Sequence, residues 1–278
     1  MDLSIIIVSW NVREKLQENL SALLAATGDF KFEVFVVDNN SADGSAAMVQ
    51  KEFPLVKLIA NNENRGFAAA NNQAIKQASG EFILLLNPDM QVEPDTLIKI
   101  LVWARSKPQA TVVGCKLLSE NGQVVKQVRR FPRLFDQLMI TLKIPHLFPT
   151  VVDKYLWVDF NYDSPAAVDS IRGAFFLINL ENYRHLSGQE KPFLDERYFI
   201  WFEEVDFCRQ VRQWGVEIWY SPVATCVDYV GQSFKQIKRG QGQKYFRDSM
   251  LKYFQKWEKP WQYFILKIVW GFVNLFVG

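Results

Sequence analysis

The stretch that decides the fold is Phe82-Ile83-Leu84-Leu85-Leu86-Asn87-Pro88-Asp89. Five consecutive apolar residues are typical of a parallel strand that is buried on both faces of a sheet. The next three residues end this strand and place the Asp89 carboxylate at its carboxyl end. Open α/β sheets bind their ligands at that edge. We therefore predict a ligand-binding sheet in which Asp89 belongs to the site.

Strand and helix patterns alternate on both sides of this stretch. We expect strands at 3–9, 33–38, 56–60 and 81–86, and helices at 12–26, 44–53, 68–77 and 94–106. After a strand at 112–118, residues 132–163 lose their periodicity and are interpreted as a partly helical excursion over the site. A strand within 170–178, a helix at 203–214 and a strand at 216–220 follow. The pattern predicts the α/β class, with a Rossmann-like, mostly parallel central sheet flanked by helices.

The composition is that of a folded protein without a disulfide framework. Of the 278 residues, 49% are hydrophobic and 22% are charged, so the chain can bury a large core. Cys115, Cys208 and Cys226 have no CxxC spacing, which argues against disulfides and against a structural zinc site. A reducing, cytoplasmic setting is expected, and the first residues do not resemble a signal peptide. His146 and His185 fit no catalytic motif.

Two polar segments accompany the predicted edge of the sheet. Asp38-Asn39-Asn40-Ser41 follows the second strand, and Asn64-Arg65-Gly66-Phe67 opens the helix before the 81–86 strand. Together they suit a nucleotide diphosphate, with Asp38 accepting a hydrogen bond from the base. Asp89 can share Mg2+ or Mn2+ with the phosphates. Each segment alone is also explained by ordinary turn chemistry, and Asp89 by helix capping.

The strongest acidic cluster is Glu203-Glu204-Val205-Asp206, which follows the apolar run Phe199-Ile200-Trp201-Phe202. Acids in the first turn of a helix interact favourably with the helix dipole, so helix-start chemistry is one explanation. The apolar approach favours another, because partial desolvation raises the pKa of a carboxylate toward the value that a general base needs. Glu203, Glu204 and Asp206 are therefore the candidate catalytic residues.

Six motifs, in this order, resemble glycosyltransferase family 2 of the bacterial rhamnosyltransferase-like type. They are Ser4-Ile5-Ile6-Ile7-Val8-Ser9-Trp10-Asn11, Val37-Asp38-Asn39-Asn40-Ser41, Asn64-Arg65-Gly66-Phe67, Leu85-Leu86-Asn87-Pro88-Asp89, Arg172-Gly173-Ala174 and Glu203-Glu204-Val205-Asp206. The resemblance covers about the first 235 residues. It implies a GT-A fold, a nucleotide-diphosphate sugar donor, a divalent cation and inversion at the anomeric carbon.

The resemblance also assigns roles to single residues. Glu204 stands where the family has the second acid of a Glu-Asp pair, the general base, with Glu203 or Asp206 as alternatives. Asp89 is the metal-binding acid of an Asp-any-Asp motif that begins here with Asn87, and Asp228 stands where relatives often place a metal-contacting His. The donor-binding candidates are Ser9, Asn11, Asp38, Asn40, Asn64, Arg65, Gly66, Phe67, Asn71 and Asn87. The candidates for contacting the acceptor or the sugar are Arg172, Gly173, Ala174 and Trp201.

The C-terminal segment differs from the rest in charge and aromatic content. Residues 235–278 carry a net charge of +7, against −5 for residues 1–234. The stretch after Pro260 contains a single charged residue, and its eighteen residues are at the margin of the roughly 20 that span a membrane. Its aromatic residues favour an amphipathic helix that lies in an anionic membrane surface. A helix packed on the catalytic domain, or an oligomer contact, is the alternative. Nucleic acid is a poor candidate partner because the body is acidic.

These observations predict a catalytic domain at 1–234, with a nucleotide-sugar-binding half at 1–110 and an acceptor-binding half at 111–234, followed by a membrane-associating tail at 235–278. The expected activity is inverting transfer of a sugar, with rhamnose a candidate, from a dTDP-, UDP- or GDP-linked donor. A lipid-linked or other glycan acceptor of cell-surface polysaccharide synthesis is expected, on the cytoplasmic face of the membrane. A nucleotidyltransferase is an alternative, but no glycine-rich basic loop follows the first strand. A catalytically degenerate scaffold is the other alternative.

Overall fold

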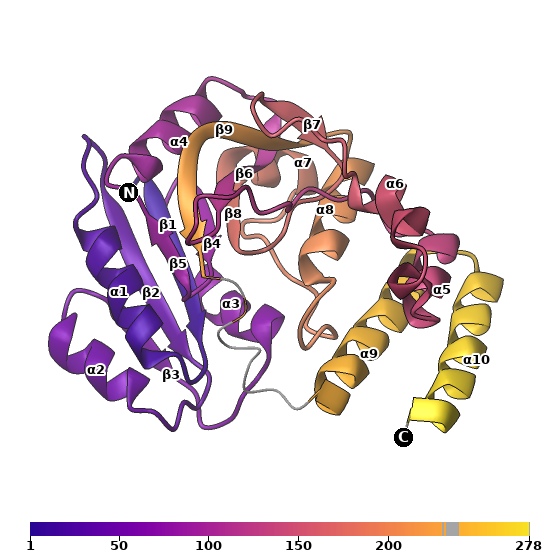
Figure 1. Cartoon of the computed structure of the whole chain (residues 1–278). Helices are drawn as coiled ribbons and strands as arrows, with labels where there is room; N and C mark the ends of the chain where they lie inside the picture. Colours follow the sequence, from indigo (N-terminus) through magenta and orange to yellow (C-terminus); the bar gives the residue numbers. More distant parts are fainter. Residues whose placement is uncertain (230, 232–238, 278) are drawn as a thin grey trace.

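The computed structural model describes residues 1–229, 231 and 239–277, and it confirms the predicted α/β architecture (Figure 1). Nine strands form one mixed sheet in the order β3-β2-β1-β4-β8-β6-β9-β5, with β7 paired to β9. The strands are β1 (Leu3–Ser9), β2 (Phe32–Asp38), β3 (Lys57–Ala60), β4 (Phe82–Leu86), β5 (Met90–Val92), β6 (Ala110–Leu118), β7 (Ala166–Val168), β8 (Phe175–Asn179) and β9 (Glu217–Asp228).

The helices lie on both faces of this sheet and in a separate C-terminal group. The α-helices are α1 (Arg13–Leu24), α2 (Ser45–Glu52), α3 (Phe67–Ile75), α4 (Thr96–Arg105), α5 (Leu134–Thr141), α6 (Asp153–Leu156), α7 (Leu180–Ser187), α8 (Glu203–Gln213), α9 (Arg239–Trp257) and α10 (Pro260–Val277). Two 3-10 turns, η1 (Ile144–His146) and η2 (Pro149–Val152), connect α5 to α6. One apolar layer packs α1, α2 and α4 on the sheet, and a second packs α3, α7 and α8 on the opposite face.

The first 86 residues form four parallel strands of the sheet, and β6 and β9 form a further parallel pair. β1 pairs in parallel with β2 and with β4, and β2 pairs in parallel with β3. All five residues of β4 are buried, as expected for a strand covered on both faces. Ser9 lies opposite Asp38 at the carboxyl ends of β1 and β2. These pairings place the polar segments that follow the strands at one edge.

β8 is antiparallel, and this explains how later motifs reach the same edge. The predicted strand within 170–178 begins only at Phe175. This strand, β8, enters the sheet between β4 and β6 in the opposite direction. Phe175 therefore lies opposite Leu86, and the Asn87 amide donates to the Ala174 carbonyl at 2.9 Å. The segment Arg172-Gly173-Ala174 is thereby held beside Asn87.

The last strand is longer than expected. The sequence pattern predicts a strand at 216–220, whereas β9 continues to Asp228, where it pairs with the unpredicted strand β5. Met90 lies opposite Asp228, and the Tyr229 amide donates to the Asp89 carbonyl at 3.1 Å. This pairing brings the two aspartates to neighbouring strand ends.

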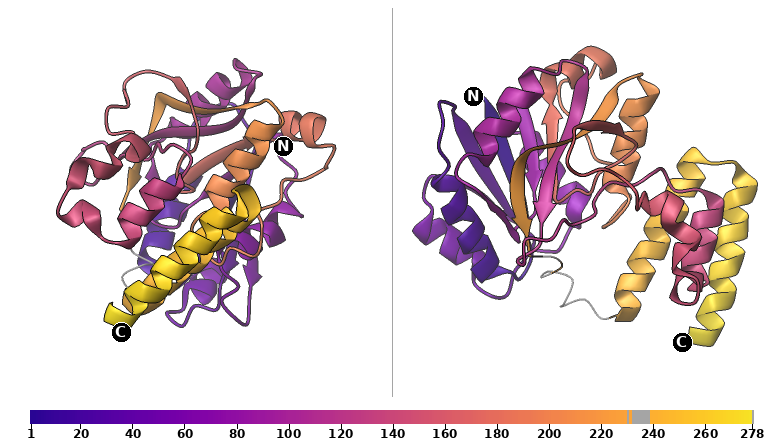
Figure 2. Two further views of the ribbon diagram at one scale, coloured as in Figure 1. Left: turned by 90° about the vertical axis from the view of Figure 1, so that its right-hand side faces the viewer. Right: turned by 45° about the horizontal axis from the view of Figure 1, so that its top comes forward.

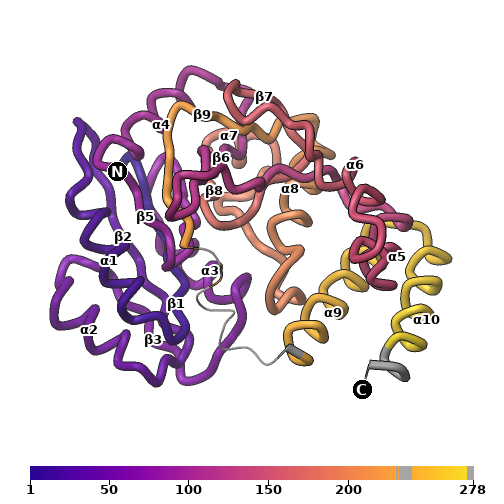
Figure 3. Tube along the Cα trace, in the orientation of Figure 1, coloured from indigo at the N-terminus to yellow at the C-terminus, as the bar shows by residue number. Residues whose placement is uncertain are grey.

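The excursion after β6 packs against the C-terminal helices through α5 and against the sheet through Phe160 and Tyr162, whose rings contact Tyr220 of β9. α10 lies beside both α5 and α9 (Figures 2 and 3). A third apolar core, which includes Phe202, Tyr253 and Leu266, joins these helices to the segment before α8. No helix of the described part of the chain is long and apolar enough to cross a membrane. The predicted domain boundary between residues 234 and 235 lies outside the described residues.

Candidate functional site

A cavity of about 480 Å³ lies at the carboxyl ends of the parallel strands. This volume is within the range of about 300–1,000 Å³ that is typical of small-molecule sites. Its walls come from the sheet edge, from the segment before α8, and from α9. The lining residues are Val8, Trp10, Asn39, Asn64, Gly66, Phe67, Asn87, Pro88, Asp89, Arg172, Phe199, Ile200, Asp228, Gly231, Gln241 and Tyr245.

Ser9 and Asp38 provide buried polar atoms at the ends of β1 and β2. Oδ2 of Asp38 accepts a hydrogen bond from the Ser41 amide at 2.9 Å. Oδ1 of Asp38 and Oγ of Ser9 are buried and have no hydrogen-bond partner among the described residues. Because buried polar atoms are nearly always satisfied, this pair is suited to a ligand that donates a hydrogen bond.

Asn11 and Asn40 shape the loops around this pair. Both residues have left-handed backbone conformations, with φ of 52° and 63°. The Asn11 amide donates to Ser41 Oγ at 2.9 Å, and Asn11 Oδ1 accepts from the Ala42 amide at 2.7 Å. Asn11 therefore ties the loop after β1 to the loop after β2. Asn40 is exposed, and the cavity is lined instead by its neighbour Asn39.

The turn at Gly66 connects the donor side to the segment before α8. Gly66 has φ of 80°, and a Cβ at this position would overlap the Phe199 carbonyl oxygen. The Phe67 amide donates to that same oxygen at 2.7 Å, and Asn64 Oδ1 accepts from the Gly66 amide at 3.0 Å. Only glycine allows this close approach.

The remaining donor candidates near this turn have different surroundings. Arg65 is exposed and is not among the residues that line the cavity. Asn71 is buried, and its Nδ2 donates to the Phe67 carbonyl at 2.9 Å. Its Oδ1 has no partner in the part of the chain that the structure describes. Asn71 therefore supports the start of α3 from below the turn.

The residues predicted to hold a metal ion lie together at the ends of β4 and β9. Asp89 and Asp228 both line the cavity, and Asp228 forms an ion pair with Arg172 at 3.1 Å. No cluster of three metal-binding side chains occurs within residues 1–229, 231 and 239–277. Mg2+ and Mn2+ are commonly held by one or two carboxylates plus substrate phosphates, so Asp89 with the neighbouring Asn87 fits such an ion. Asp228 already forms an ion pair with Arg172, so Asp228 is less available as a metal ligand.

Glu203 and Glu204 begin α8 after two residues with left-handed backbones. Trp201 and Phe202 have φ of 64° and 71°, conformations that bulky residues rarely adopt. Burial raises the pKa of Glu203 well above its ordinary value, and the neighbouring Glu204 raises it further. Burial also raises the pKa of Glu204, against the opposing effect of the Arg172 charge.

Glu204 is directed toward the motif residues of the cavity wall. A Cβ built on Gly173 would lie 3.6 Å from the Glu204 Cβ and 3.8 Å from the Phe67 ring. Oε2 of Glu203 and Oε2 of Glu204 are both buried without a hydrogen-bond partner among the described residues. Neither glutamate is among the residues that line the cavity, but Glu204 is adjacent to Gly173, and the nearby Arg172 and Phe67 do line it. A desolvated carboxylate in this position can accept a proton from a hydroxyl that reaches it.

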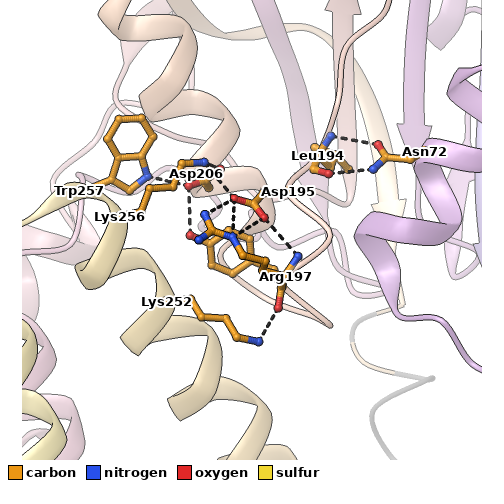
Figure 4. Close-up of polar contacts among 9 residues, drawn as sticks. Asn72, Leu194, Asp195, Arg197, Asp206, Lys252, Lys256 and Trp257 are labelled. Atoms are coloured by element: carbon orange, nitrogen blue, oxygen red, sulfur yellow. Dashed lines mark hydrogen bonds and ion pairs between the residues drawn. The ribbon is translucent and has the colours of Figure 1, made fainter.

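Asp206, the third acid of the cluster, contacts α9. Its carboxylate accepts from Trp257 Nε1 at 2.6 Å, from Lys256 Nζ at 2.7 Å and from the Tyr198 hydroxyl at 3.1 Å (Figure 4). The Trp201 ring likewise packs against Phe246 of α9, with 6.2 Å between ring centroids. Neither Asp206 nor Trp201 is among the residues that line the cavity.

Sequence reasoning missed several lining residues. Trp10 and Asn39 lie inside motifs that were recognised, so their position next to Ser9 and Asp38 was an available signal. Phe199 belongs to the apolar run before the acids. Gln241 and Tyr245 lie in the C-terminal segment, and only the tertiary packing of α9 brings them to the cavity.

Comparisons with known proteins agree with this geometry. A family model described as Glycosyl transferase family 2 matches residues 4–161. The chain is 34% identical over 117 residues to an uncharacterized glycosyltransferase, YfnE, of Bacillus subtilis, covering 41% of this chain but only 30% of that protein. It is 24% identical over 242 residues to the N-acetylglucosaminyl-diphospho-decaprenol L-rhamnosyltransferase of Mycobacterium tuberculosis, covering 83% of this chain and 77% of that protein.

A solved structure shows the same fold. The mannosyltransferase PcManGT from Pyrobaculum calidifontis, in complex with GDP-Man and Mn2+, superposes with a TM-score of 0.59 at 18% sequence identity. The match covers 98% of this chain and 70% of that one. The similarity therefore includes the C-terminal helices.

Proposed function

The chain belongs to glycosyltransferase family 2, and from this premise we propose that it transfers a sugar, with inversion, from a nucleotide-diphosphate donor to a lipid-linked glycan acceptor. The observation that carries the proposal is one cavity that is lined by Asn39, Asn64, Asn87 and Asp89, near which Glu203 and Glu204 each keep one buried oxygen without a hydrogen-bond partner among the described residues. The nucleotide, the diphosphate and the acceptor hydroxyl can therefore bind at neighbouring positions in and beside this cavity.

The reaction that fits this arrangement is a single displacement. The acceptor hydroxyl oxygen forms a bond to the anomeric carbon while the bond from that carbon to the diphosphate breaks. Glu204 takes the hydroxyl proton, and its raised pKa makes it a stronger base than an exposed glutamate. Phe67 lines the cavity and lies with Glu204 around Gly173, so a reactant bound against the Phe67 ring lies close to this residue.

The donor is held by the residues at the sheet edge. Asp38 Oδ1 and Ser9 Oγ are suited to the base, and Asn39 and Asn64 line the adjoining wall. When Mg2+ or Mn2+ is bound at Asp89 and Asn87, it supplies positive charge that stabilises the leaving diphosphate. Arg172 also lines the cavity, where its ion pair with Asp228 fixes the position of its guanidinium group.

The finer assignment is a rhamnosyltransferase that acts at the cytoplasmic face of a membrane. Its support is the similarity over most of the chain to an L-rhamnosyltransferase whose name specifies a polyprenyl diphosphate acceptor. The PcManGT complex, with its nucleotide sugar and Mn2+, supports the donor class and the metal. The basic C-terminal segment supports attraction to anionic lipid.

Donor hydrolysis tests this proposal. The purified protein is incubated with dTDP-, UDP- and GDP-linked sugars, with and without Mn2+, and release of the nucleoside diphosphate is measured. We expect one donor to be hydrolysed in a metal-dependent way. A parallel incubation with nucleoside triphosphates measures release of pyrophosphate. Turnover in that incubation alone would indicate a nucleotidyltransferase, and no turnover in either would indicate a degenerate scaffold.

Asp89→Asn is expected to abolish metal-dependent donor binding and to leave the fold intact, because the Asp89 side chain lines the cavity. Asp95→Asn is the matched control, since Asp95 pairs with Lys99 on α4 and is not among the lining residues. Calorimetric titration with donor and Mn2+ measures the effect. Equal donor affinity in the Asp89 variant and the control would remove Asp89 from the site.

A further inference from the structure

We propose that α9 forms the acceptor side of the active site, and that Asp206 is the positioning residue that fixes α9 to the helix carrying the catalytic acids. The inference rests on the proposed function, because it assigns a subsite within the same cavity. The ligand class is a pyranose ring, whose apolar face packs on aromatic side chains. Asp206 thereby receives a role other than that of a base.

α9 contributes two residues to the cavity wall. Gln241 and Tyr245 both line it, and their spacing of four residues places them on one face of the helix. The Tyr245 ring stacks on Phe199, with 4.5 Å between centroids and 25° between planes. Phe199 and Tyr245 both line the cavity, so this aromatic pair offers an apolar surface on which the second substrate can pack.

Side chains of α8 bind the C-terminal end of α9. Lys256 and Trp257, in the last turn of α9, both donate to the Asp206 carboxylate. Arg209, three residues further along α8, forms an ion pair with Glu258 at 2.6 Å and donates to the Tyr253 hydroxyl at 2.8 Å. One face of α8 therefore holds the C-terminal end of α9.

Neighbouring contacts strengthen this attachment. Asp195 accepts from Lys256 at 3.1 Å and also forms an ion pair with Arg197 at 2.6 Å (Figure 4). The Lys252 ammonium donates to the Arg197 carbonyl. Ser249, midway along α9, donates to the Ile200 carbonyl at 2.8 Å. The helix is thus tied to the backbone before α8 as well as to α8 itself.

The hydrogen bonds of Asp206 distinguish it from the two glutamates. Asp206 is buried, and its two oxygens receive hydrogen bonds from three donors, one of them a cation. Glu203 and Glu204 each keep one buried oxygen without a partner among the described residues. A carboxylate whose oxygens are already engaged cannot take a substrate proton without breaking these bonds, and breaking a buried pair is strongly unfavourable.

The contacts that attach α9 to α8 lie far from the part of α9 that lines the cavity. Tyr245 and Lys256 are eleven residues apart, which corresponds to about 16 Å along a helix. A small rotation at the attached end therefore displaces the Tyr245 ring from Phe199. The consequence is that contacts remote from the substrate control acceptor binding.

Kinetics of three variants and one control test the proposal. The variants are Asp206→Asn, Trp257→Phe and Tyr245→Ala. Lys244→Met is the control, because Lys244 lies on α9 and its ion pair with Asp248 stays within that helix. The donor is dTDP-rhamnose, and the acceptor is N-acetylglucosamine linked through a diphosphate to a short alkyl chain. Circular dichroism verifies that each variant is folded.

We expect the acceptor KM to rise about tenfold in Tyr245→Ala and in Asp206→Asn, and about threefold in Trp257→Phe. Donor hydrolysis should stay within about twofold of wild type in all three. Loss of turnover in Asp206→Asn with both KM values unchanged and a normal Trp257→Phe would make Asp206 the base. A raised donor KM in Tyr245→Ala would assign this wall to the donor. Either result overturns the proposal.

Hydrogen exchange of residues 241–248 provides a readout that needs no turnover. Faster exchange in Asp206→Asn than in Lys244→Met supports the positioning role, and equal exchange in the two variants contradicts it. If the wild-type protein hydrolyses no donor, the proposed function fails, while exchange still decides whether Asp206 fixes α9.

Discussion

Glu203 and Glu204 are adjacent in sequence, but their surroundings favour different protonation states. Burial raises the pKa of both, and Glu203 is raised further by Glu204, whereas Arg172 opposes the shift at Glu204. Two desolvated carboxylates this close do not both ionise readily. This difference supports the proposal that Glu204 acts as the base, with Glu203 the more readily protonated of the two.

Glu204→Gln is expected to lower turnover about 100-fold or more with unchanged donor affinity, because it removes the proton acceptor and keeps the shape. The raised pKa of Glu204 also places the acid limb of the wild-type pH profile above the range of an ordinary glutamate. Steady-state kinetics against pH measures both effects. If Glu203→Gln is the inactive variant, the assignment of the base is wrong by one residue.

Glu203→Gln is expected to increase folding stability at high pH. Because burial raises the pKa of Glu203, the folded state holds a proton that the unfolded chain has lost, so wild-type stability falls as the pH rises above the ordinary range of glutamate. The variant lacks this loss. Urea unfolding at about pH 5 and about pH 8 measures it, with the exposed Glu14→Gln as control. An advantage of the same size at both pH values would contradict the assignment.

At the scale of elements, the Gly66 turn joins α3 to the segment before α8. Gly66→Ala combines an unfavourable backbone conformation with an overlap at the Phe199 carbonyl oxygen. Gly188→Ala is the matched control, because Gly188 has φ of 68° and nothing lies within 4 Å of an added Cβ. We expect the control to lose about 1 kcal/mol and Gly66→Ala clearly more, measured by urea unfolding. Equal losses would show that the close approach to Phe199 is unimportant.

The sequence predicted well those elements whose apolar pattern is set locally. The strand at 82–86 and its polar end are of this kind, because burial on both faces requires a continuous apolar run. The direction of β8 could not be predicted, since an apolar run of five residues is equally compatible with parallel and antiparallel pairing. The extension of β9 was missed for a related reason, because Pro222 argues against a central strand.

The sequence predicted the candidate site only where its residues lie in local motifs. Asn64, Gly66, Asn87 and Asp89, which the motifs proposed as site residues, line the cavity. Adjacency in sequence could not distinguish the lining Asn39 from the exposed Asn40. Asp206 was grouped with the glutamates because it shares their helix turn. Its partners Lys256 and Trp257 are about fifty residues away in the sequence, so no local pattern reveals them.

At the scale of the whole molecule, α10 presents an apolar stripe to solvent. Leu266 and Trp270 face the third core, while the outer face carries exposed apolar residues: Trp261, Phe264, Ile265, Ile268 and Phe272. The adjoining excursion adds further exposed apolar residues: Phe135, Leu142, Leu147 and Phe148. A stripe of this kind, next to basic residues, is typical of a helix that lies on a membrane.

Replacing Phe264, Ile268 and Phe272 with Ser is expected to abolish binding to anionic vesicles, because the apolar contribution is lost. The control replaces Leu24, Leu55 and Val102, which are equally exposed on the α1, α2 and α4 side of the sheet. Co-sedimentation with vesicles measures binding. High salt should weaken wild-type binding only in part, since each basic residue contributes about 1 kcal/mol that salt screens. Equal binding by both variants would exclude α10 as the docking surface.

The position of β8 between β4 and β6 also affects the order in which the strands can pair during synthesis. β1, β2, β3 and β4 can pair once residue 86 has emerged, but the free edge of β4 has no partner until residues 175–179 are made. At roughly 5–20 residues per second, this interval lasts about 4 to 18 seconds. An open apolar edge is a template for pairing with another chain. The edge of β4 is therefore open to pairing with other chains until the second half is synthesised.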